Sequence, residues 1–150
     1  MPAARTPVAE AAVGRLVALR PPRPDDRAAC RLIHRRADGA LVGAINLTGI
    51  VRGMFQSGCL GYYIGASYAG RGYMTEALQL MLRTAFRTLR LHRVEASIQP
   101  GNRASIALVE RAGFRREGYS RRYLKIAGRW RDHERWALLA EEWRPRGRRG

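Results

Sequence analysis

Apolar residues recur with two different periods along the chain, and the change of period separates strands from helices. In the first half, extended runs bounded by turn residues predict four strands: 15–20, 30–36, 41–50 and 59–64. Pro21 and Pro22 stop the first of these runs, and Asp38-Gly39 is typical of a hairpin turn between the next two. Residues 30–64 therefore read as an antiparallel meander.

The clearest helical pattern follows the sequence Gly70-Arg71-Gly72. Apolar residues recur there at i, i+3, i+4, i+7, i+8 and i+11, namely at Leu78, Met81, Leu82, Ala85, Phe86 and Leu89. This single stripe predicts a helix with one buried face. A strand at 93–99, a helix at 103–111 that ends at Gly113, and a closing hairpin follow. The predicted hairpin runs are 114–118, 123–126 and 130–138, with Gly128 at the turn.

This order of elements predicts a mixed α/β (α+β) fold with two helices and a mostly antiparallel sheet. We assign residues 1–14 to a loose N-terminal arm, 15–143 to one domain, and 144–150 to a basic tail. A chain of 150 residues with 46% hydrophobic and 27% charged residues suits a single globular domain.

The cysteines and the hydropathy of the sequence bear on the compartment in which the protein resides. Cys30 and Cys59 form neither a disulfide framework nor a set of zinc ligands, so we expect a reducing compartment and no metal. The N-terminal residues lack the apolar region of a signal peptide, and no apolar run has the length of a membrane span. These features predict a cytoplasmic protein.

The formal net charge is +16, and Lys125 is the only lysine among the 28 basic residues. Coding bias toward arginine is one explanation of this composition. Attraction to polyanions, such as RNA, the ribosome or a phosphorylated cofactor, is the other. Composition alone does not choose between them.

Two local motifs carry candidate chemistry. The segment 67–76 (SYAGRGYMTE) places glycines between a strand and a helix, where free N–H groups and an open backbone suit a diphosphate. A plain glycine turn is the alternative, and the pattern of a nucleotide P-loop is absent. In the second motif, Asn102 is by default a helix cap and Ser105 a solvent-facing hydroxyl.

Taken together, the glycine loop, the Asn102/Ser105 pair and Gly113-Phe114 occur in an order that resembles the GNAT acyltransferases. The segments 91–96 (LHRVEA), 113–118 (GFRREG) and 128–133 (GRWRDH) are similar to the RimJ branch of that family. The resemblance covers roughly residues 15–143. It implies the acyl-CoA N-acyltransferase fold, acetyl-CoA as co-substrate, and acetylation of the N-terminal alanine of a ribosomal protein.

The resemblance also implies roles for individual residues. Backbone N–H groups would hold the pyrophosphate of acetyl-CoA at Tyr68, Ala69, Gly70, Arg71, Gly72 and Tyr73. Asn102 would contact the pantetheine arm, and Ser105 would stabilise or protonate the departing thiolate. The strands at 62–64 and 93–98 would splay apart to receive the thioester. The tyrosine that many family members use as general acid is replaced here by Val109.

The acceptor side and the general base are less defined. An N-terminal amine has a pKa near 8, so positioning supplies much of the catalysis, with help from a base acting through water. Glu95 is our first candidate for that base, and an ion pair with an arginine is the alternative. Tyr62, Asp132 and His133 are expected on the acceptor side, although a cross-strand ion pair would also explain Asp132 and His133.

The chain departs from the family between Asp26 and Cys30. Several dozen residues that carry the first two helices of the fold are missing there, so we expect apolar sheet surface to be exposed and to favour association. Three functions follow: an N-terminal acetyltransferase, a GNAT domain that binds CoA without acceptor turnover, and a non-enzymatic module that binds RNA or the ribosome through its arginines.

Overall fold

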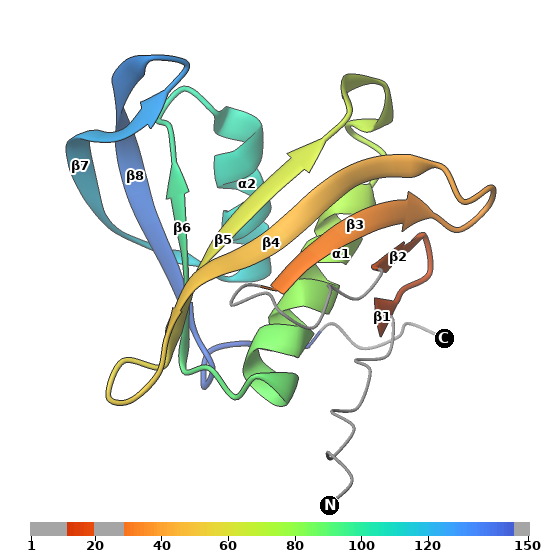
Figure 1. Ribbon diagram of the computed structural model, residues 1–150, viewed down its shortest axis with the longest axis horizontal. Coiled ribbons are helices and arrows are strands. Elements are labelled where there is room, and N and C mark those ends of the chain that lie inside the picture. Colours follow the sequence, from red (N-terminus) through yellow and green to blue (C-terminus); the bar gives the residue numbers. More distant parts are fainter. Residues whose placement is uncertain (1–11, 20–28, 146–150) are drawn as a thin grey trace, which may run out of the picture.

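The computed structural model describes residues 12–19 and 29–145, and Figure 1 shows the arrangement of their elements. Parts of the predicted N-terminal arm and basic tail lie outside these residues, and so does the connection 20–28. Strand β1 (Ala12–Val13) falls within the range assigned to the arm. None of the described helices is long and apolar enough to cross a membrane.

One sheet contains all eight described strands, in the order β1-β2-β3-β4-β5-β6-β8-β7. After β1, the strands are β2 (Val17–Leu19), β3 (Ala29–Arg35), β4 (Leu41–Val51), β5 (Ser57–Ile64), β6 (Arg93–Ile98), β7 (Arg115–Ile126) and β8 (Arg129–Leu139). Only β5 and β6 pair in parallel, and every other pair of neighbours is antiparallel. The predicted mixed, mostly antiparallel sheet is confirmed.

Two α-helices cover one face of the sheet: α1 (Tyr73–Arg83) and α2 (Arg103–Ala112) (Figure 1). Leu78, Met81 and Leu82 of α1 are at most 1% exposed, which confirms the apolar stripe. They pack with inward-facing strand residues such as Ile45 and Val94, so the core lies between the helices and this face.

The long helix continues beyond Arg83 as a π-helical turn, η2 (Thr84–Thr88), rather than as a regular α-helix. The Leu89 N–H reaches back to the Thr84 carbonyl, and the Thr84 hydroxyl donates to the carbonyl of Leu80. Such a wide turn changes which side chains face inward. Phe86 stays buried and its ring packs on Trp143, with 5.6 Å between ring centroids.

The closing hairpin also differs in detail from its prediction. The two runs expected at 114–118 and 123–126 are one continuous strand, β7, because its register with β8 shifts at two bulges instead of breaking. A bulge absorbs extra residues while the ladder continues on either side.

The opposite face of the sheet is not covered by either described α-helix. Leu32 and Tyr63 lie in one cross-strand row there, through Ala44, and are 46% and 70% exposed. Strands β2 and β3 are antiparallel neighbours joined by only nine residues, 20–28. Two helices of several turns need far more chain than that.

Candidate active site

A cavity opens where the two parallel strands separate. Pairing between β5 and β6 runs from Ser57 with Arg93 to Leu60 with Ala96 and then stops, although both strands continue. Beyond that point, a cavity of about 620 Å³ is lined by the end of β5, the glycine loop, the first turn of α1 and one side of α2. The two strands separate as predicted, and the cavity lies between the end of β5 and α2, without a residue of β6 in its lining.

The glycine loop forms one wall of this cavity. Gly70 and Gly72 have φ values of +75° and +80°, a conformation that glycine adopts without strain. Gly72 is the N-cap of α1, and no side chain caps the helix there. The first N–H groups of α1 are therefore available at the cavity, which is the environment that an anionic group needs.

The start of α2 forms the facing wall. The Asn102 Oδ1 accepts a hydrogen bond of 3.2 Å from the Ser105 N–H, which confirms Asn102 as the N-cap. Both residues line the cavity. Gly113 ends the helix with φ of +98°, so α2 is fixed at both ends and holds Ser105 in place.

Tyr62 and Ser105 meet inside the cavity, with 2.5 Å between their hydroxyl oxygens. Burial raises the pKa of the Tyr62 phenol, and its hydrogen bond with Ser105 acts in the opposite direction. The phenol is therefore protonated at neutral pH. Either hydroxyl can be the donor in this geometry. When Tyr62 donates, the Ser105 hydrogen is free to point toward a third group.

Glu95 lies within the paired part of β6, opposite Cys59, and lines neither this cavity nor the second one described below. Its carboxylate accepts a 2.7 Å hydrogen bond from Arg93 Nε. An ion pair with an arginine is the predicted alternative to a catalytic role for Glu95, and Arg93 supplies it.

A second cavity, of about 550 Å³, lies between the loop 99–102 and the β7–β8 hairpin. Asp132 lines it and accepts hydrogen bonds from the Arg122 N–H, at 2.8 Å, and the Tyr119 hydroxyl, at 2.7 Å. These two bonds hold the pKa of Asp132 below its ordinary value. Asn102 lines both cavities, so the two are neighbours across the start of α2.

The structure separates the predicted site residues into two groups. The cavity between β5 and α2 brings together residues from β5, the glycine loop, α1 and the start of α2: Tyr62, Ala69, Gly70, Gly72, Tyr73, Asn102 and Ser105. Tyr68 and Arg71 flank this wall without lining it. His133 is 3% exposed and lines neither cavity, but its Nδ1 contacts the carbonyl oxygen of Arg131, which lines the second cavity, at 2.9 Å.

Sequence reasoning missed one side of the cavity. Ala104, Leu108 and Arg111 of α2 line it, as do Met74 and Thr75 of α1. The α2 residues stand at i, i+4 and i+7, a helical spacing that would have placed them on one face with Ser105 next to it. The contact between Tyr62 and Ser105 had no sequence signal, because it joins residues 43 positions apart.

Comparisons with known proteins agree with this geometry. Residues 10–115 match the family model described as "Acetyltransferase (GNAT) domain". The chain is 41% identical over 107 residues to the probable N-acetyltransferase YjcK of Bacillus subtilis. It is 43% identical over 105 residues to the [ribosomal protein uS5]-alanine N-acetyltransferase of Escherichia coli.

A solved structure, Mycobacterium smegmatis RimJ in complex with CoA-disulfide, superposes with a TM-score of 0.73 at 38% identity. The match covers 77% of this chain and 55% of that one. The matches to the two curated relatives cover 71% and 70% of this chain, but only 59% and 54% of the relatives' own lengths.

Proposed function

The chain belongs to the GNAT acetyltransferase family, and from that premise we propose that it is an N-acetyltransferase that uses acetyl-CoA. The observation that carries the proposal is the cavity that the end of β5, the glycine loop and α2 enclose. There the glycine loop and the Tyr62–Ser105 pair occupy facing walls.

The walls fit the two chemically different parts of acetyl-CoA. The backbone N–H groups from Gly70 to Tyr73 would bind the pyrophosphate, with Arg71 adding positive charge nearby. The N–H groups of Tyr68 and Ala69, which the sequence also suggested, donate instead to the carbonyls of Gly65 and Ala66. The side-chain amide of Asn102 would contact the pantetheine arm while its oxygen caps α2. Acetyl-CoA would supply the activated acetyl group as a thioester.

Ser105 would stabilise the leaving group, which is the thiolate of CoA. In the proposed reaction, the amine nitrogen forms a bond to the acetyl carbon, the carbon–sulfur bond breaks, and sulfur takes the electron pair. The Ser105 hydroxyl would stabilise the thiolate by donating a hydrogen bond to it, while Tyr62 donates to the Ser105 oxygen. The proton that the amine loses goes to water, since an N-terminal amine is partly neutral at pH 7 without a strong base.

We propose the N-terminal alanine of a ribosomal protein as the acceptor, supported by the E. coli relative that is named for this activity. The acceptor would approach from the cavity beside the hairpin, where Asp132 carries a negative charge that suits an ammonium group. Tyr62 and His133 belong to the same proposal as neighbours of this approach. A CoA-binding domain without turnover is the second candidate, because the chain spans 54–59% of its curated relatives.

The first experiment is thermal unfolding with acetyl-CoA. A ligand that binds only the native state at 100 times its Kd stabilises by about 2.7 kcal/mol, or a shift of about 5–10 °C in a domain of this size. Mass spectrometry of a peptide with a free N-terminal alanine then tests transfer, with the N-acetylated peptide as control. A shift without transfer would favour the second candidate, and no shift would refute both.

A matched pair of variants tests whether the glycine loop binds the pyrophosphate of acetyl-CoA. Gly70 and Gly39 have similar φ values, +75° and +73°, and each would leave an added Cβ without contacts. Gly70→Ala and Gly39→Ala should therefore lose similar stability, about 1–2 kcal/mol. Only Gly70→Ala should also reduce the shift caused by acetyl-CoA. Equal shifts for both variants would contradict the proposed pyrophosphate site.

A further inference from the structure

The tip of the β7–β8 hairpin, residues 121–131, stands clear of the sheet. Strand β8 pairs with β6 only from Glu134 to Leu139, so residues 129–133 pair with β7 alone. Every residue of the tip is exposed. Figure 1 shows the hairpin projecting beyond the end of β6. An isolated two-stranded ribbon is marginally stable in water, so this exposed ribbon needs an explanation.

The tip carries unbalanced positive charge. It contains five cations and no acidic residue: Arg121, Arg122, Lys125, Arg129 and Arg131. None of the five forms an ion pair with a described residue, whereas Arg35, Arg93, Arg115 and Arg116 elsewhere each do. Asp132, beside the tip, is held by Tyr119 and the Arg122 backbone. Arginines outside the tip, such as Arg15 and Arg83, also lack an ion pair with a described residue. What distinguishes the tip is the density of its cations, five within eleven residues with no carboxylate among them.

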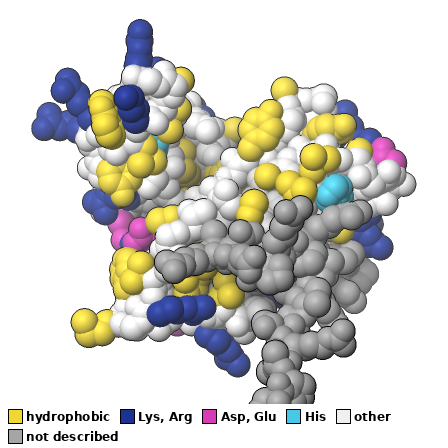
Figure 2. Space-filling view, in the orientation of Figure 1, with side chains coloured by type: hydrophobic (Ala, Val, Ile, Leu, Met, Phe, Trp, Pro, Cys, Tyr) yellow, Lys and Arg dark blue, Asp and Glu magenta, His cyan; other side chains and the backbone are white. Residues whose placement is uncertain are grey.

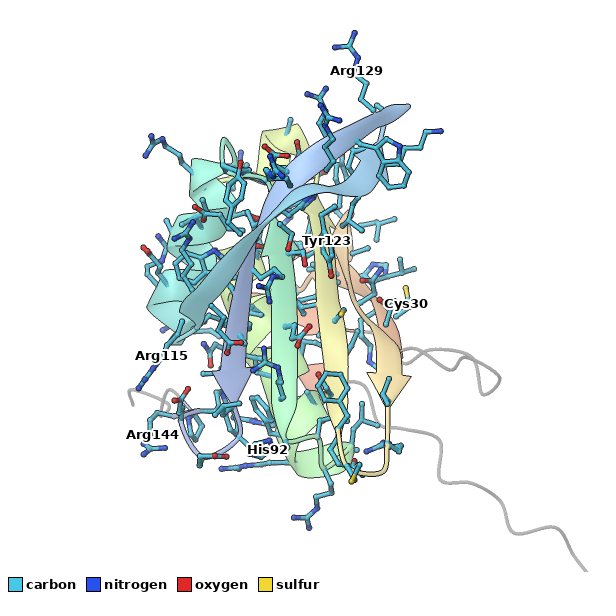
Figure 3. The ribbon with its side chains drawn as sticks, turned by 90° about the vertical axis from the view of Figure 1, so that its left-hand side faces the viewer. Cys30, His92, Arg115, Tyr123, Arg129 and Arg144 are labelled. Carbon is cyan, nitrogen blue, oxygen red and sulfur yellow. The ribbon has the colours of Figure 1, made fainter. Side chains whose placement is uncertain are left out.

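Each of the three cations nearest the turn lies directly opposite an apolar residue on the neighbouring strand. The cross-strand pairs are Lys125 with Trp130, Arg131 with Leu124, and Arg129 with Ile126. Directly opposed residues lie on the same face of a ribbon, so both faces present a cation beside an apolar group. Trp130 is 60% exposed and Tyr123 is 44% exposed. Figure 2 shows dark blue and yellow side chains interleaved at this end, and Figure 3 shows Arg129 pointing away from the body.

We propose that the hairpin tip is a docking surface for single-stranded RNA. Arginine and lysine side chains bind phosphates, and exposed aromatic rings stack on unpaired bases, so alternation of the two matches a nucleic-acid strand. Unpaired bases are an ordinary feature of folded RNA, whereas duplex DNA stacks its bases inside. None of the five cations lines the cavity between β5 and α2, but Arg122, Arg131 and Trp130 line the second cavity, where the acceptor is proposed to approach. The test therefore measures RNA binding directly, without acetyl transfer.

The same features disfavour three other partners. Insertion into a membrane surface needs an apolar face that is separate from the charged one, and here each face carries both kinds of side chain. A second copy of this chain would bring a tip of the same charge. An anionic protein lacks the planar bases that Trp130 and Tyr123 would stack on.

Fluorescence anisotropy with a labelled 12-nucleotide single-stranded RNA tests the proposal on the whole chain. Arg121→Gln/Arg129→Gln should weaken binding about 10-fold or more at 100 mM salt. It should also make the slope of log K against log salt shallower by about 1.4, which corresponds to two lost phosphate contacts. The matched control, Arg15→Gln/Arg83→Gln, removes two exposed cations distant from the tip and should change affinity less than about 2-fold.

A second variant separates stacking from charge. Trp130→Leu should weaken binding about 5-fold or more without changing the salt slope, because it removes a ring and no cation. Thermal unfolding curves that match the unchanged chain confirm that all variants fold.

Three results would overturn the proposal. The first is equal loss for the tip and control variants. The second is binding of duplex RNA as tight as that of the single strand. The third is binding to phosphatidylserine vesicles, lost in the tip variant, without binding to RNA.

Discussion

Tyr62 and Ser105 share a hydrogen bond inside the cavity, and this contact gives a prediction at the scale of single residues. Tyr62→Phe keeps the ring and removes only the donor that orients Ser105. We expect kcat for acetyl transfer to fall about 5- to 30-fold, the effect of losing one buried hydrogen bond of about 1–2 kcal/mol, with KM for acetyl-CoA little changed. Steady-state kinetics measures both parameters.

A double-mutant cycle makes that test specific. In a Ser105→Ala background, Tyr62→Phe should have no further effect, because the hydroxyl that it orients is gone. Additive losses would mean that Tyr62 acts independently of Ser105. Tyr123→Phe, in the hairpin, is the control for losing an aromatic hydroxyl outside the cavity between β5 and α2.

Residues also show where sequence reasoning succeeds and where it stops. Asn102 as a cap and Gly113 as a left-handed helix end follow from local backbone chemistry, and both are confirmed. The position of Glu95 depends on how far β5 and β6 stay paired, which no local pattern encodes. The Tyr62–Ser105 contact requires the tertiary arrangement of a strand and a helix, so it appears only in the structure.

At the scale of elements, Glu76 attaches helix α1 to the N-terminal strands. Its carboxylate accepts hydrogen bonds from the backbone N–H groups of Arg15, Leu16 and Val17, the last two at 2.6 and 2.7 Å. Glu76→Ala should lower the free energy of unfolding by about 2 kcal/mol, because charge-assisted hydrogen bonds are lost at a partly exposed site. Chemical denaturation measures this value.

The control is Glu110→Ala, which removes an exposed carboxylate of α2 that has no hydrogen bond or ion pair with the described residues. It should change stability by less than about 0.5 kcal/mol. A similar loss in both variants would mean that helix composition, and not the contact with the strands, causes the effect.

A second element-scale contact spans β8. Arg93 of β6 donates to both carboxylate oxygens of Glu117 on β7, at 2.9 and 2.5 Å, and β8 lies between these strands. These hydrogen bonds hold the pKa of Glu117 below its ordinary value. A carboxyl whose pKa is lower in the folded state adds stability above its unfolded pKa of about 4.3 and loses it as pH falls through the folded value.

The melting temperature of the unchanged chain should therefore fall more steeply below about pH 4.5 than that of Glu117→Gln. Thermal unfolding between pH 3 and pH 7 tests this, and the two curves should be furthest apart at neutral pH. Parallel curves over the whole range would show that the ion pair adds nothing to stability. Glu110→Gln again provides the control.

At the scale of the whole molecule, the uncovered sheet face and the net charge oppose each other. Leu32 and Tyr63 offer apolar surface for association, while a charge of +16 drives copies apart. Salt screens the repulsion but not the apolar attraction. Sedimentation should therefore detect more association at 0.5 M than at 0.05 M salt.

Leu32→Thr/Tyr63→Thr should reduce that salt-induced association, and threonine suits a strand. Tyr123→Thr/Leu124→Thr, which removes similar side chains from the hairpin, is the control and should leave it unchanged. Association that weakens as salt rises would contradict this account, because charge attraction would then be its cause.

The parallel pair β5–β6 divides the molecule into two parts that are each continuous in sequence. Strands β1–β5 precede the long helix, and β6–β8 follow it. Only four residue pairs join the two parts within the sheet, and the cavity opens directly beyond the last of them. The two parts can therefore move relative to each other at the β5–β6 pairing without breaking any antiparallel ladder. A ligand in the cavity would contact β5 of the first part and α2 of the second, and would so restrict this motion. Ligand binding and the rigidity of the whole fold should therefore increase together.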